Sequence, residues 1–132
     1  MLRLALVGSI FVIALPLWAA EANRIDIRAL ARNQHSLIGE RISTHGCLVN
    51  TPHGSFIWPC GSRDWHELTL IADPKDLGEE AFRKLGINFA SHVEGDFTGV
   101  LVEITDTRPG PEPDTRVFLK LESIANARAY TP

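Results

Sequence analysis

The chain has 132 residues, of which 45% are hydrophobic and 22% are charged, a composition typical of a folded globular protein. This balance excludes a disordered chain, and the length favours one domain over several. The formal net charge of −3 lacks the surplus of Lys and Arg with which proteins bind phosphate backbones, so we expect no nucleic-acid partner.

The first 22 residues have the layout of a secretory signal peptide. Arg3 provides a positive n-region, residues 4–17 form an apolar h-region, and a small-x-small cleavage site ends at Ala22. The alternative is a retained membrane anchor, but the apolar run is shorter than the roughly 20 residues that a spanning helix needs. We therefore predict cleavage after Ala22, a single mature domain at residues 23–132, and a periplasmic or secreted location without membrane attachment.

Hydrophobic periodicity predicts a mainly β domain with two helices. Apolar residues at helical spacing indicate a short N-terminal helix over residues 23–36. A second helix is predicted over residues 73–86, because Asp73 and Pro74 form a start signal and Gly86 forms an end signal. Alternating apolar and polar residues bounded by turn residues predict strands at residues 41–49, 55–60, 67–72, 93–104 and 116–123.

Cys47 and Cys60 are the only cysteines, and an even number in an exported chain indicates a disulfide. The segment Pro52-His53-Gly54 between them has the composition of a hairpin turn. A two-residue turn at His53-Gly54 would place residue 47 opposite residue 60, unless a β-bulge shifts the pairing. We therefore predict a structural disulfide across this hairpin.

The order of three strands, a helix and two strands favours a small, five-stranded Greek-key barrel. Residues 37–124 resemble an OB-fold. The likeness rests on a glycine-bent first strand at residues 39–46, a helix after the third strand, and the Gly-x-Phe-x-Gly stretch that begins at Gly95 and ends at Gly99. We expect these two glycines to bend the fourth strand. The resemblance is to small exported OB-fold domains, and it implies a fold and a binding surface without naming an activity.

In an OB-fold, ligands usually bind to the second and third strands and to the loops that join strands 1 to 2 and 4 to 5. The binding residues that we expect from this resemblance, where aromatic and polar side chains coincide, are Trp58, Arg63, Trp65, His66, His53 and Arg108. Aromatic rings supply stacking area, and Arg63 and Arg108 are suited to an anionic or hydroxyl-rich group. The competing interpretation is that Trp58 and Trp65 cap the barrel and pack on the disulfide.

The sequence contains no nucleophile elbow, P-loop, dinucleotide fingerprint or paired-carboxylate motif, so we expect neither catalysis nor a cofactor. The favoured function is an exported, non-enzymatic module that binds a small molecule, a glycan or an envelope protein. One alternative is a metal-binding or redox-active protein that uses the cluster of His45, Cys47, His53, Cys60 and His66. Another is a secreted inhibitor or immunity-like protein, which differs from the favoured module only in what it binds.

Overall fold

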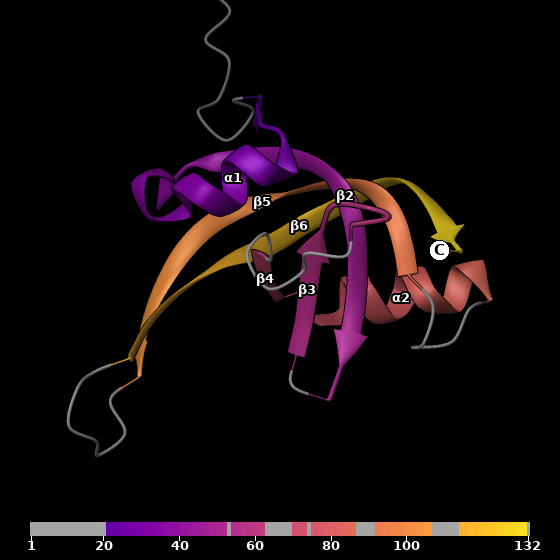
Figure 1. Ribbon diagram of the computed structural model, residues 1–132. Coiled ribbons are helices and arrows are strands. Elements are labelled where there is room, and N and C mark those ends of the chain that lie inside the picture. Colours follow the sequence, from indigo (N-terminus) through magenta and orange to yellow (C-terminus); the bar gives the residue numbers. More distant parts are fainter. Residues whose placement is uncertain are drawn as a thin grey trace, which may run out of the picture.

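The computed structural model describes residues 21–52, 54–62, 70–73, 75–86, 92–106 and 114–131. The predicted signal segment at residues 1–20 lies outside these ranges. The described part is mainly β (Figure 1). Its strands are β1 (Asn23–Arg24), β2 (Arg41–Thr51), β3 (Gly54–Trp58), β4 (Leu70–Asp73), β5 (His92–Asp106) and β6 (Asp114–Tyr130). Its helices are α1 (Ile27–Asn33), the single 3-10 turn η2 (Gln34–Leu37) and α2 (Lys75–Leu85).

Each of the five predicted strands has a counterpart, and β1 is an addition. The strands form one sheet in the order β1-β2-β3-β4-β6-β5, and β2 also pairs with β5. This extra pairing closes the strands from β2 to β6 into a ring of hydrogen-bonded neighbours. In Figure 1, β2, β5 and β6 are long curved strands, with α1 above them and α2 below. None of the helices in the described ranges is long and apolar enough to cross a membrane.

The core lies between the curved strands and the two α-helices. Alternate residues of β2 and β6 face inward as expected, and Ile42, Leu48 and Leu119 are fully buried. α1 contributes Ile27 and Leu30, and α2 contributes Phe82. The remaining fully buried apolar side chains of the strands are Ile57, Leu70, Val93, Phe97 and Leu101.

Both helices begin later than predicted. Asn23 and Arg24 pair with β2 in parallel, so they are extended, and α1 starts after Asp26, whose carboxylate accepts hydrogen bonds from the backbone N–H groups of residues 28 and 29. Asp73, the predicted cap of the second helix, is the last residue of β4. The expected end is present: Gly86 follows α2 with a φ of +64°, a conformation that suits glycine.

The β2–β3 hairpin has a different register from the predicted one. Thr51 pairs with Gly54 and Cys47 pairs with Trp58, a shift of two residues from a pairing of residue 47 with residue 60. The connection is therefore residues 52 and 53, and Gly54 belongs to the strand with a φ of +133°. Turn composition located the hairpin correctly, but it did not fix which two residues form its tip.

The last strand is longer than predicted, because β6 continues to Tyr130 instead of ending at residue 123. Two register shifts in the β5–β6 ladder each place one extra residue in β6. The core-facing residues Leu121, Ile124 and Ala127 are consequently three positions apart instead of two. This spacing breaks the alternation by which strands are identified in sequence.

The register shifts fall at Gly95 and Gly99, the two glycines expected to bend this strand. A Cβ atom at Gly99 would lie 2.2 Å from the backbone oxygen of Lys120, and one at Gly95 would lie 3.0 Å from the backbone oxygen of Ala125. The first distance is impossible for real atoms, so β6 can approach β5 this closely only opposite a glycine.

We expect the substitution Gly99→Ala to lower the free energy of unfolding by more than about 1 kcal/mol, because the backbone of β6 must move away. Gly95→Ala should cost less, since its contact needs only a small shift. Glu103→Ala, on an exposed position of the same strand, is the control and should stay within about 0.5 kcal/mol of the parent. Urea unfolding measures all three. A Gly99→Ala protein as stable as the parent would contradict the close approach.

Candidate functional site

Of the six expected binding residues, only Trp58 lies within the described ranges. Trp58 is the last residue of β3 and is half-buried. The other five expected residues, Arg63, Trp65, His66, His53 and Arg108, lie outside the described ranges. The candidate site therefore consists of Trp58 and the described side chains around it.

Cys47 and Cys60 form the predicted disulfide, with 5.1 Å between their Cα atoms. β3 ends at Trp58 because Pro59 has no N–H to continue the ladder. The chain then turns, with Ser62 N–H donating to the Pro59 carbonyl at 3.1 Å. Cys60 thus reaches β2 from beyond the end of β3, so the predicted disulfide is confirmed although the register from which it was argued is wrong. The bond holds this turn against the outer side of β2, where Cys47 is fully buried.

Three aromatic side chains lie beside this turn. The rings of His92 and Tyr130 are stacked, with centroids 6.2 Å apart, and Trp58 meets His92 edge-on at 5.6 Å. His92 is the first residue of β5 and pairs with Tyr130 at the end of β6. Tyr130 also lies over the disulfide turn, since a Cβ atom at Gly61 would come within 2.8 Å of its hydroxyl. We call Trp58, His92 and Tyr130 the aromatic group.

His92 is kept neutral by its position in the aromatic group. Burial lowers the pKa of its imidazole, because the charged form would lose hydration. Its Nδ1 atom is buried and has no hydrogen-bond partner among the described residues. His92 therefore acts here as a flat, uncharged ring.

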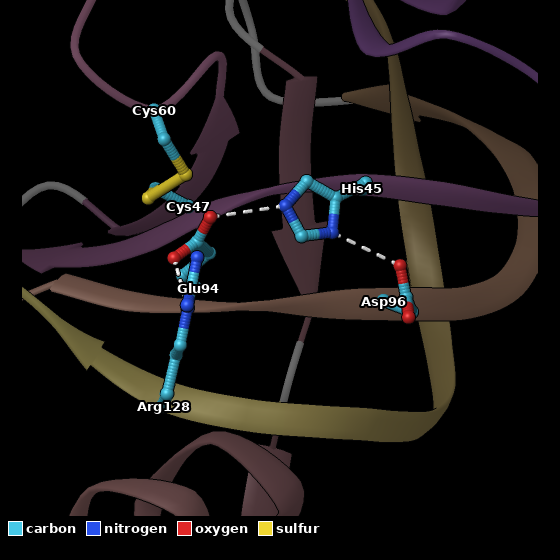
Figure 2. Close-up of a disulfide and its surroundings, with 6 residues drawn as sticks. All are labelled: His45, Cys47, Cys60, Glu94, Asp96 and Arg128. Atoms are coloured by element: carbon cyan, nitrogen blue, oxygen red, sulfur yellow. Dashed lines mark hydrogen bonds and ion pairs between the residues drawn. A yellow bond between two sulfur atoms is a disulfide. The ribbon is translucent and has the colours of Figure 1, made fainter.

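A network of charged groups lies beside the disulfide on the outer side of β2, β5 and β6 (Figure 2). His45 stands between two carboxylates: its Nε2 is 3.1 Å from Glu94 Oε1, and its Nδ1 is 3.0 Å from Asp96 Oδ1. A neutral imidazole has one N–H, so only the protonated ring donates to both. The hydrogen bonds to Asp96 and then Glu94 raise the pKa of His45 above 6.5.

β6 completes the network from the other side. Arg128 Nε donates to Glu94 Oε2, and Asn126 Nδ2 donates to Asp96 Oδ2 at 2.9 Å. These hydrogen bonds, with those from His45, lower the pKa of both carboxyl groups. Glu94 is only 8% exposed, so a buried carboxylate is held on one oxygen by His45 and on the other by Arg128. We call His45, Glu94, Asp96, Asn126 and Arg128 the charged network.

This arrangement does not favour the metal-binding or redox alternative. The two thiols form a disulfide, and both nitrogens of His45 already face carboxylates. Within the described ranges, no group of three His, Cys, Asp or Glu side chains is arranged to hold a metal ion. His53 and His66, the other members of the expected cluster, lie outside those ranges.

The charged network was not expected from the sequence. Glu94 and Asp96 lie two positions apart, which places them on one side of β5 and is the only local signal. Their partners come from strands about 30 to 50 positions away, and the separations for His45 are 49 and 51. Finding them needs the β2–β5 register, in which His45 pairs with Asp96.

No protein-family model, curated protein or solved structure matches the chain.

Reduction of the disulfide should destabilise the domain by about 3 kcal/mol, because the bond closes a short loop and restricts the unfolded chain. Urea unfolding with and without reductant measures this difference, and intact mass should rise by about two hydrogen masses on reduction. Two thiols that react with an alkylating agent in the untreated native protein would contradict the bond.

The raised pKa of His45 should make the free energy of unfolding depend on pH. A histidine whose pKa is raised on folding contributes stability that is complete below 6.5, its unfolded value, and is lost as the pH rises through the folded pKa. The network should stabilise the fold most at a pH below 6.5 but above the acidic range in which Glu94 and Asp96 become protonated. We expect the unfolding free energy of the parent to fall relative to that of His45→Gln as the pH rises above about 6.5.

Within the described ranges, Glu94 and Asp96 face His45, and Arg128 and Arg24 are paired with these two carboxylates. His92 titrates in the opposite direction, since its pKa is lowered, but it is present in both proteins and cancels in the difference. A difference between parent and His45→Gln that does not vary with pH would show that folding does not raise the pKa of His45.

Proposed function

We propose that the chain is an exported, non-enzymatic binding module and that its ligand binds at the aromatic group. The observation that carries this proposal is the position of Trp58, His92 and Tyr130 on the outer side of the sheet, fixed beside a disulfide. Aromatic rings provide large contact areas with little loss of conformational entropy. A disulfide that already orders the neighbouring turn reduces the entropy that binding must remove.

The polar side chains of the surface support binding over catalysis. The described groups best suited to acid–base chemistry, His45, Glu94 and Asp96, hydrogen-bond to one another and to β6. A general base needs a nitrogen or oxygen free to reach a substrate proton, and every side-chain nitrogen and oxygen of these three residues already has a hydrogen-bond partner. Their arrangement fixes the surface instead of leaving a reactive atom exposed.

An OB-fold-like barrel is the architecture that we propose for the domain. The closed ring of pairings and the place of α2 between β4 and β5 agree with the five-stranded Greek-key order. In that comparison, β3 and β4 correspond to the strands on which OB-folds usually bind their ligands, and Trp58 ends β3.

The disulfide agrees with an oxidising compartment. Cleavage after Ala22 would leave β1 intact at the start of the mature chain.

A fluorescence titration tests the proposal, because Trp58 and Trp65 are the two tryptophans that remain after signal cleavage. The purified protein would be titrated with cell-wall fragments, oligosaccharides and envelope proteins, and the last arm also covers the inhibitor or immunity-like alternative. We expect a saturable change with one class. Replacing one ring by a smaller, non-aromatic side chain in Trp58→Leu or Tyr130→Leu should weaken binding by about tenfold.

Phe118→Leu provides the matched control, since Phe118 is a half-buried aromatic residue of β6 paired with β4, away from the aromatic group. Its affinity should equal that of the parent. Circular dichroism and thermal unfolding would establish that each variant is folded. Unchanged affinity in folded Trp58→Leu and Tyr130→Leu proteins would refute this location of the site and support a packing role for the rings.

A further inference from the structure

Arg128 is held in place by a buried acid. Its Nε atom donates to Glu94, which is 8% exposed and is also bound by His45 on its other oxygen. Glu94 therefore cannot turn away without breaking both contacts. A guanidinium fixed in this way has lost much of its side-chain entropy before any ligand arrives.

Most of the Arg128 side chain nevertheless faces solvent, since it is 72% exposed. Guanidinium has five N–H donors, and one carboxylate engages at most two of them. Glu94 is the only partner of Arg128 within the described ranges. At least three N–H donors therefore remain for a ligand on a side chain that is mostly exposed.

The aromatic group lies next to Arg128 along the same strands. Arg128 and Tyr130 lie two positions apart on one side of β6, and their partners Glu94 and His92 lie two positions apart on β5. Two residues of a strand span about 7 Å. The backbone positions that carry the exposed guanidinium and the stacked rings are thus close neighbours on one side of the sheet, at a spacing that one aromatic acid could bridge.

The net charge of the surrounding groups indicates the charge that a ligand should carry. Arg24, Arg128 and protonated His45 carry three positive charges, and Glu94 and Asp96 carry two negative ones, so the sum is +1. A single negative charge neutralises this surface, whereas a phosphate dianion would leave it with a net charge of −1.

We propose that Arg128 is the anion-binding residue of this surface and that the ligand carries a carboxylate joined to an aromatic or similarly flat apolar group. This inference rests on the proposed binding function and names its ligand class. The carboxylate accepts from the exposed edge of Arg128, and the flat group contacts the rings of Tyr130, His92 and Trp58. Glu94 and His45 act as positioning residues for Arg128.

The test uses hydrocinnamate as the probe, with hydrocinnamamide as its uncharged match and phenyl phosphate as the dianionic one. Binding is followed by the amide NMR spectrum of the labelled protein near pH 6.5, where the raised pKa keeps His45 mostly charged and the phosphate is mostly a dianion. We expect hydrocinnamate to shift the signals of Arg128 and Tyr130 saturably. The amide and the phosphate should each bind at least about tenfold more weakly, because a charge-assisted hydrogen bond is lost or opposed.

Arg128→Gln should reduce the affinity for hydrocinnamate at least about tenfold while leaving the weak affinity for the amide unchanged. Arg83→Gln is the matched control, because Arg83 is an exposed arginine of α2, away from this surface, and its affinity should equal that of the parent. If Arg128→Gln proves unstable, the pH profile provides the second test. Hydrocinnamate should bind more weakly as His45 loses its proton, and this dependence should vanish in His45→Gln.

Two results would separate the failure of this inference from the failure of the proposed function. Equal binding of hydrocinnamate and its amide, both at Tyr130, would overturn the role of Arg128 and leave an aromatic binding surface. Tighter binding of phenyl phosphate would overturn the carboxylate assignment. If none of the three probes shifts a signal at Tyr130 or Arg128, the ligand class is wrong, and the titrations of cell-wall fragments and envelope proteins decide the proposed function separately.

Discussion

The close approach of β6 to the glycines of β5 is the constraint on which the rest of the structure depends. β5 pairs with β2 along one edge and with β6 along the other, so it must curve strongly while both ladders continue. The backbone of Lys120 occupies the space that any side chain at Gly99 would fill. Without this contact β6 would separate from β5, and the ring of pairings that encloses Phe97 and Leu101 would open.

The bulges that accompany these glycines also decide what the outer side of the sheet presents. Opposite Gly95, β6 contains one extra residue, and Asn126 has a φ of +54°, which asparagine tolerates better than most residues. The shift directs Asn126 toward Asp96 and restores Arg128 to a position opposite Glu94. Curvature of the ring and assembly of the charged network therefore have the same cause.

The charged network and the disulfide order the surface in complementary ways. The network joins β2, β5 and β6 by hydrogen bonds that leave Glu94 satisfied although it is nearly buried, which offsets the cost of removing a carboxylate from water. The disulfide joins β2 to the turn beyond β3 covalently. Trp58, His92 and Tyr130 lie beside these two fixed parts, and this rigidity is what a preorganised binding surface requires.

The sequence by itself determined the elements whose signals are local. Hydrophobic alternation located the five main strands, Gly86 marked the end of α2, and the count of cysteines indicated the disulfide. These features depend on neighbouring residues or on composition, so one chain is enough to read them. The extra length of β6 was not predicted, because the bulges change the spacing of its core-facing residues from two positions to three.

Only the tertiary structure decided register, and register decided the surface. The hairpin is shifted by two positions from the turn-based expectation, which keeps the inward and outward sides but changes every partner. His45 meets Asp96, and Arg128 meets Glu94, because of the pairings of β5 with β2 and β6. Such contacts join residues tens of positions apart, and their energies depend on distances that no local pattern specifies.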